Sequence, residues 1–212
     1  MVRCDIPSNN FLITRKAGNL VAMALSLEDF EEEVVPTLKE YASIPCLSPG
    51  FDSSWESAGH LARAIDLYAE WARGRRFQDH TVEVRHLDGR TPVLVVTVEA
   101  TAPVSGTVLL YGHLDKQPPL GDWSEGLDPY VPVRRGNQLF ARGVADDGYA
   151  MFASLLAIEE LERNDVPHAR CVVLIEASEE SGSPDLDAHL DEMTDHLGNV
   201  ELMICLDSGA LT

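Results

Sequence analysis

Residues 107–115 read TVLLYGHLD, a run of strand-forming residues that ends in a histidine and an aspartate. Two more apolar runs of strand length, 171–175 and 202–206, also lead into acidic residues. Helical patterns at 147–163 and 185–197 lie between these strands, so crossover connections join them. We therefore predict an α/β fold with a mixed, largely parallel sheet that is flanked by helices.

Upstream of this stretch the periodicity changes from helical to strand-like. Amphipathic patterns predict helices at 26–41 and 55–73, and β-branched runs predict strands at 81–87 and 93–98. A short strand is expected at 138–142, after a proline-rich loop. The sequence before residue 26 fits none of these patterns.

Residues 1–25 are predicted to be an N-terminal extension, disordered or preceding a true start at Met23. A signal peptide is a weaker alternative, because the stretch is only mildly apolar and has no clear cleavage site. We assign residues 26–212 to the N-terminal portion of one catalytic domain. The boundary at residue 26 rests on the start of the first predicted helix.

The chain is strongly acidic, with 35 Asp and Glu residues against 16 Lys and Arg residues and a formal net charge of −19. Such a surface repels phosphate backbones and anionic lipids, so we expect neither nucleic acid nor membranes as partners. The four cysteines are far apart and form no CxxC pair, which favours reduced thiols in the cytoplasm. Cations are the partners that this charge attracts.

Polar residues follow three of the apolar runs, at the points where ligands bind in open α/β sheets. They are His113 and Asp115 after the first, Glu179 and Glu180 after the second, and Asp207 after the third, with Asp146 and Asp147 ahead of a helix. Singly, each has an ordinary explanation as a loop histidine, a helix N-cap or a solvated acid. Together, such crowded carboxylates need a cation, and a mixed histidine and carboxylate set suits zinc, with manganese or cobalt as alternatives.

Four segments in order carry a family resemblance: YGHLD at 111–115, ARGVADDG at 141–148, EESGS at 179–183 and LDS at 206–208. They resemble the dinuclear zinc amidohydrolases, which include acetylornithine deacetylase, succinyl-diaminopimelate desuccinylase, carboxypeptidase G and the carnosinase-type dipeptidases. The resemblance spans residues 26–212 and is strongest to the dipeptidase branch. It implies the N-terminal half of a zinc-peptidase catalytic domain.

The resemblance also implies roles for individual residues. The metal ligands would be His113, Asp146, Glu180 and Asp207, with Asp146 shared between two zinc ions. The catalytic residues would be Glu179, as the general base, and Asp115, which would orient the His113 imidazole. A cis peptide bond is expected between Asp146 and Asp147.

Two departures from the family pattern limit what the resemblance implies. The lysine that the family usually carries after the paired acids is replaced by Gly148. No histidine follows Asp207, so the family's last ligand and its lid domain are not in this sequence, and a homodimer through that lid stays open. His189 and His196 are predicted to be surface residues of a helix and not substitutes for that ligand.

We therefore predict a metal-dependent hydrolase that cleaves an amide bond in small peptides or N-acyl amino acids with a metal-activated water. The 212 residues by themselves are expected to have little activity, since a ligand and the lid are missing. The competing hypothesis is a non-catalytic metal-binding fragment or structural paralogue. A third is an ordinary α/β domain with an acidic rim.

Overall fold

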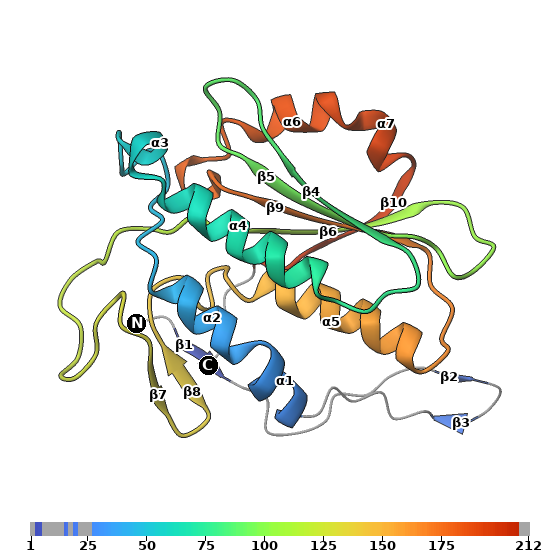
Figure 1. Cartoon of the computed structure of the whole chain (residues 1–212), viewed down its shortest axis with the longest axis horizontal. Helices are drawn as coiled ribbons and strands as arrows, with labels where there is room; N and C mark the ends of the chain where they lie inside the picture. The colour runs from blue at the N-terminus through green and yellow to red at the C-terminus, as the bar shows by residue number, and fades with distance from the viewer. Residues whose placement is uncertain (1–2, 6–14, 17–18, 21–26, 208–212) are drawn as a thin grey trace.

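The computed structural model describes residues 3–5, 15–16, 19–20 and 27–207. Its centre is a five-stranded sheet in the order β10-β6-β9-β5-β4 (Figure 1). The strands are β4 (His80–Arg85), β5 (Val93–Val98), β6 (Thr107–His113), β9 (Arg170–Glu176) and β10 (Val200–Cys205). Residues 107–113 thus form the strand that the sequence predicts.

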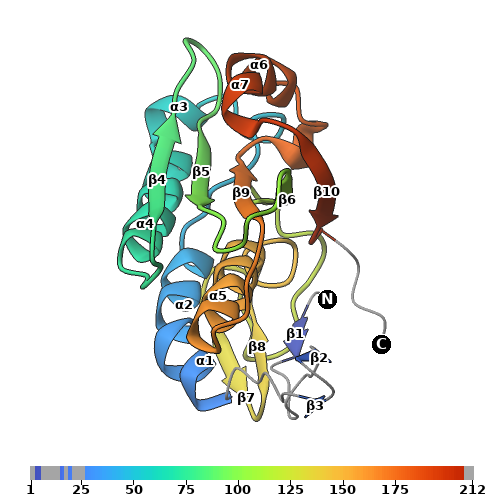
Figure 2. The same cartoon turned by 90° about the vertical axis from the view of Figure 1, so that its right-hand side faces the viewer.

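The sheet is mixed, as predicted. β6 lies parallel to both β9 and β10, whereas β5 is antiparallel to β9 and to β4. Figure 2 shows β4 at one edge of the sheet and β10 at the other. The three parallel strands end at the same edge, and this edge receives the polar residues that follow them.

Helices cover both faces, which explains why all six residues of β5 are buried. Alternate side chains of a strand point to opposite faces, so Leu94 and Val96 pack with α2 (Val35–Ala42), α4 (His60–Arg73) and α5 (Ala150–Arg163). Val93 and Val95 pack on the other face, against α6 (Leu186–Glu192) and α7 (Thr194–Leu197). The apolar runs at 93–98 and 171–175 are therefore strands buried on both sides, whereas the run at 202–206 forms most of the exposed edge strand β10.

Three predicted helices are interrupted in the structure. The first is α1 (Leu27–Glu33) followed by α2, and the last is divided into α6 and α7. Between α3 (Trp55–Ala58) and α4, Gly59 adopts a left-handed φ of 70° that ends the short helix and starts the long one. Gly59 was the signal for this break in the sequence, but the spacing of apolar residues, from which the helix was predicted, takes no account of a glycine.

His189 corrects the prediction that it is a surface residue. Its side chain is buried, and Nε2 lies 2.8 Å from the carbonyl oxygen of Thr91. His196 Nε2 lies 2.9 Å from Thr97 Oγ1, at the face of the sheet that α7 covers. His189 therefore attaches α6 to the loop before β5, and His196 attaches α7 to β5 itself.

A smaller three-stranded sheet, β1-β8-β7, consists of β1 (Arg3–Asp5), β8 (Gln138–Phe140) and β7 (Val133–Arg135). β2 (Arg15–Lys16) and β3 (Asn19–Leu20) form a separate antiparallel pair. Most of the predicted extension at 1–25 lies outside the described residues, so its character stays a prediction. Within the described part of the chain, no helix is both long and apolar enough to cross a bilayer.

Candidate metal centre

The carboxyl ends of β6, β9 and β10 bring three loops together at one edge of the sheet. β6 ends at His113, the turn after β9 is a 3-10 helix at Glu179–Ser181, and Asp207 follows β10 by two residues. Asp146 comes from the segment before α5 and is joined to Asp147 by a cis peptide bond, as the resemblance implied. Neither aspartate is the N-cap of α5, because that position belongs to Tyr149.

His113 lies at the centre of the cluster. Its Nε2 is 3.3 Å from Asp146 Oδ1, 3.8 Å from Glu179 Oε2 and 4.0 Å from Asp207 Oδ2. The side chain is fully buried, and among the described residues Nε2 has no hydrogen-bond partner. One buried imidazole nitrogen therefore faces three carboxylates from three different loops.

Asp115 contacts both the His113 imidazole and the turn that carries Glu179 and Glu180. Its backbone oxygen lies 3.1 Å from His113 Nδ1, and its carboxylate lies farther from that nitrogen, at 3.4 Å. The two carboxylate oxygens accept hydrogen bonds from the backbone amides of Glu179 and Glu180, at 3.1 and 3.0 Å. Asp115 thus holds the imidazole mainly through its main chain and the Glu179 turn through its side chain.

The electrostatics reflect crowded charge in a buried place. Burial lowers the pKa of His113, but the neighbouring carboxylates of Asp115 and Asp146 outweigh it and raise this pKa to about 11. The nearby His113 imidazole lowers the pKa of Asp146. Burial raises the pKa of Glu179, against the opposing effect of His113. A carboxyl with a raised pKa is suited to accept a proton near neutral pH.

Asp147 is a member of the cluster that the sequence did not assign a role. It is fully buried, Oδ2 accepts a hydrogen bond of 3.2 Å from the His113 amide, and Oδ1 has no partner among the described residues. A Cβ on Gly112 would lie 2.5 Å from Oδ2, so a glycine at this position makes room for the carboxylate. Burial raises the pKa of Asp147 to about 7.

Glu180 lies to one side of the cluster. Gln117 Nε2 donates a hydrogen bond of 2.6 Å to Oε2, while Oε1 is buried without a partner among the described residues. Burial raises the pKa of this carboxyl, and the Gln117 hydrogen bond opposes that effect. Of the four predicted ligands, the structure brings His113, Asp146 and Asp207 together and leaves Glu180 outside this group of three.

The three grouped residues fit a divalent metal. One ligand atom from each of His113, Asp146 and Asp207 lies within 4.8 Å of the others. Imidazole nitrogen and carboxylate oxygen are both zinc ligands, and catalytic zinc sites use three protein ligands with a further position open. The unpartnered Nε2 of buried His113 is accounted for by such an ion.

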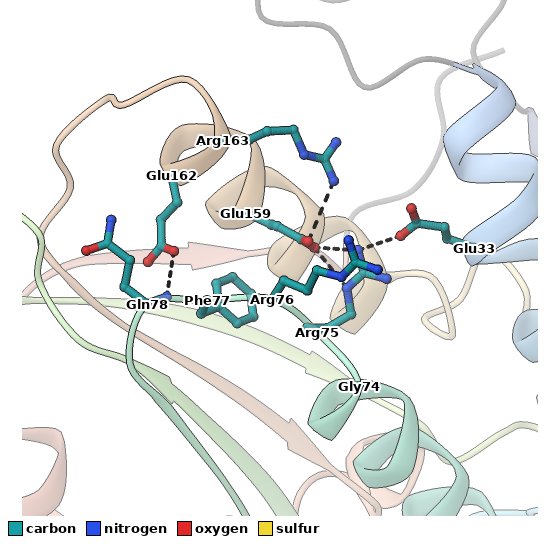
Figure 3. Close-up of a pocket in the computed structure, with 9 residues that line it drawn as sticks. All are labelled: Glu33, Gly74, Arg75, Arg76, Phe77, Gln78, Glu159, Glu162 and Arg163. Atoms are coloured by element: carbon teal, nitrogen blue, oxygen red, sulfur yellow. Dashed lines mark hydrogen bonds and ion pairs between the residues drawn. The ribbon is translucent and has the colours of Figure 1, made fainter.

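A separate pocket of about 760 Å³ has Glu33, Arg75 and Glu159 among its lining residues (Figure 3). Its lining includes the last turns of α5, a helix that starts beside the cluster and runs roughly 21 Å away from it. Arg75 is hydrogen-bonded to buried Glu159 and lies 2.5 Å from Glu33. The pocket's central charges therefore pair with one another, and the strand-end cluster is the candidate site.

Comparison with known proteins bears on the family. Residues 109–209, which include the strand-end cluster, match the model of peptidase family M20/M25/M40. The predicted family resemblance is confirmed. Among M20-like relatives, succinyl-diaminopimelate desuccinylase of Methylibium petroleiphilum is 32% identical over 123 residues, which is 57% of this chain and 31% of that protein. Human Beta-Ala-His dipeptidase is 28% identical over 189 residues, 84% of this chain and 36% of its own length.

The fold agrees with the M20 match. The structure of the M20 family metallo-carboxypeptidase Sso-CP2 from Sulfolobus solfataricus superimposes with a TM-score of 0.63 at 24% identity, covering 85% of this chain and 38% of that one. The chain thus spans about a third of the length of the relatives it matches. The similarity is to metallopeptidase-type hydrolases.

Proposed function

We propose that the protein is a zinc-dependent hydrolase of amide bonds in dipeptides or N-acyl amino acids. The observation that carries this proposal is the buried His113 imidazole, whose Nε2 faces the carboxylates of Asp146, Asp207 and Glu179. The named relatives, a desuccinylase and a dipeptidase, indicate the two substrate classes. The proposed localisation is the cytoplasm.

In this proposal His113, Asp146 and Asp207 hold one ion, and Glu180 with Asp146 offers ligands to a second. The mixed imidazole and carboxylate set suits zinc, with manganese or cobalt as alternatives, better than calcium, which prefers oxygen ligands alone. A bound ion would supply positive charge that acidifies water and stabilises negative charge on the substrate carbonyl oxygen. This leaves the proton transfers to the protein.

Glu179 is the proposed general base. Its partly exposed carboxylate can take a proton from water as the water oxygen bonds to the amide carbon, and can return a proton to the amine as the carbon–nitrogen bond breaks. Asp115 fixes this residue through the hydrogen bond from the Glu179 amide. The products are one carboxylic acid and one amine.

The test is hydrolysis of a panel of dipeptides and N-acyl amino acids, measured with and without added zinc. We expect zinc-dependent release of amine above that of a Glu179→Gln variant. The matched control is Glu192→Gln, which changes an exposed acid of α6 and should keep wild-type activity. A chain that binds zinc stoichiometrically but hydrolyses no substrate faster than Glu179→Gln would refute the proposal.

A second candidate is metal binding without turnover. It is favoured by the position of Glu180 outside the three-residue group. The same panel distinguishes the two functions, because this candidate requires zinc binding with no difference between wild type and Glu179→Gln.

A further inference from the structure

Residues 44–50, which we name the clasp, connect the end of α2 to the region of the metal loops. The Lys116 amide donates a hydrogen bond of 3.0 Å to Cys46 O, and Lys116 O accepts one of 3.0 Å from the Ser48 amide. The clasp therefore pairs with the chain directly after Asp115. Leu114 O, on the other side of Asp115, accepts a hydrogen bond of 2.8 Å from Tyr41 Oη.

The Lys116 side chain strengthens this attachment. It is fully buried, and Nζ donates hydrogen bonds to the backbone oxygens of Tyr41, Ala42 and Ile44 at 3.0, 3.2 and 2.8 Å. An ammonium group has three donors, so all three are used. The last carbonyls of a helix have no partners within it and favour positive charge, and Lys116 meets both needs at the end of α2.

A third loop is shaped around the same side chain. Gly143, three residues before Asp146, has a φ of 84°, and a Cβ at this position would lie 2.6 Å from Lys116 Cε. The turn into Asp146 therefore packs directly on the lysine stem. Lys116, three residues after His113, therefore packs against the turn that leads to Asp146, so it lies close in sequence to one proposed ligand and contacts the loop of another.

The other end of the clasp is fastened to the loop that carries the general base. The hydroxyl groups of Ser48 and Ser181 share a hydrogen bond of 2.5 Å, and Ser181 Oγ accepts one of 2.7 Å from the Gly50 amide. Ser181 directly follows Glu180. The clasp thus spans from the His113 loop to the Glu179 loop.

We propose that Lys116 and Ser181 are positioning residues that fix these two loops relative to each other through the clasp. The inference rests on the proposed metal site, and neither side chain is proposed to touch metal or substrate. Productive sites need their groups held to within about 0.5 Å by the surrounding shell. Loss of the Lys116 or Ser181 side-chain contacts should therefore reduce the affinity for zinc more than it reduces the stability of the folded protein.

The test compares Lys116→Met, which keeps the side-chain length and removes all three donors, with Arg75→Met. Arg75 is the matched control, because it is another mostly buried cation but lies in the pocket far from the cluster. We expect Lys116→Met to lower zinc affinity by about 10- to 100-fold, as changes around metal ligands do, and Arg75→Met to leave it unchanged. Equal zinc affinity in a folded Lys116→Met and in wild type would overturn the proposal.

A second variant keeps the test decisive if Lys116→Met does not fold. Ser181→Ala removes one shared hydroxyl contact, and a lost hydrogen bond corresponds to about a two- to tenfold weaker zinc affinity. Wild-type zinc affinity in Ser181→Ala would overturn the role of this residue.

A metal-free measurement separates this inference from the proposed function. The backbone amides of Glu179 and Glu180 donate hydrogen bonds to Asp115. They should exchange hydrogen at least about tenfold faster in Lys116→Met and in Ser181→Ala than in wild type, and at the wild-type rate in Arg75→Met. Unchanged exchange rates in both Lys116→Met and Ser181→Ala would refute the positioning role of these two residues. A wild type that binds no zinc refutes the proposed function instead.

Discussion

Removal of the His113 imidazole is expected to abolish stabilisation of the protein by zinc. His113 is the member of the three-residue group that is fully buried and faces both other members. In a His113→Ala variant the two remaining carboxylates, of Asp146 and Asp207, belong to partly exposed and exposed residues. Two such acids offer no geometry that distinguishes zinc from a weakly bound counterion.

The magnitude follows from linkage. A ligand at about 100 times its dissociation constant stabilises the folded state by about 2.7 kcal/mol. For a chain of this length each kcal/mol raises the midpoint of thermal unfolding by about 2 to 4 °C, so zinc should raise the wild-type midpoint by about 5 to 11 °C. The shift for His113→Ala should be close to zero.

The assay is thermal unfolding followed by circular dichroism, with and without zinc, together with the bound zinc per chain measured by atomic absorption. His86→Ala is the control, because it removes an exposed histidine distant in sequence from the site and should keep the full shift. A shift of equal size in His113→Ala and wild type would show that zinc stabilises the protein elsewhere, and the proposed centre would be wrong.

Four further outcomes are expected. Glu179→Gln should lower turnover by about 10²- to 10⁴-fold with bound zinc unchanged, and loss of zinc from this variant would contradict its role as a base. In metal-free protein His113 has a pKa near 11 against 6.5 for the unfolded chain, so its contribution to stability is complete below pH 6.5 and is lost as pH rises through 11. Zinc needs the neutral imidazole, so binding at pH 8 should release about one proton from His113, and calorimetry in two buffers of different ionisation heat should detect it; no buffer dependence would argue against His113 as a ligand. Phe152 is fully buried between the Tyr68 and Trp71 rings, so Phe152→Ala should lower the free energy of unfolding by about 3 to 5 kcal/mol in urea titrations, and an unchanged midpoint would contradict the packing.

The sequence predicted the strands and the convergence of polar residues because both depend on local patterns. The run 171–175 is apolar throughout and the run 93–98 is apolar except for Thr97, and strands buried on both faces require such runs. The proximity of His113 and Asp207 follows from parallel strands that end at one edge, and Asp146 joins them from the segment before α5. The order of strands and the antiparallel pairing of β5 with β9 depend on long-range contacts that no local pattern encodes.

Other features were hidden because residue type alone misleads. His189 lies on an acidic, helical stretch that is typical of a surface. Its side chain is nevertheless buried, and its Nε2 contacts Thr91 O. Lys116 is a charged residue in a loop, and its burial depends on three carbonyls contributed by α2 and the clasp. Asp147 adjoins a predicted ligand, and only the structure shows that its carboxylate turns toward the His113 amide.

The position of β10 has a consequence for how the molecule opens. β10 is an edge strand that pairs with β6 across about ninety residues of sequence, and such long-range parallel pairing is slow to form. It delivers Asp207, whereas His113 comes from β6 at the middle of the chain. An ion held by both would connect the edge strand to its neighbour, so fraying of β10 and release of the ion are expected to be one event.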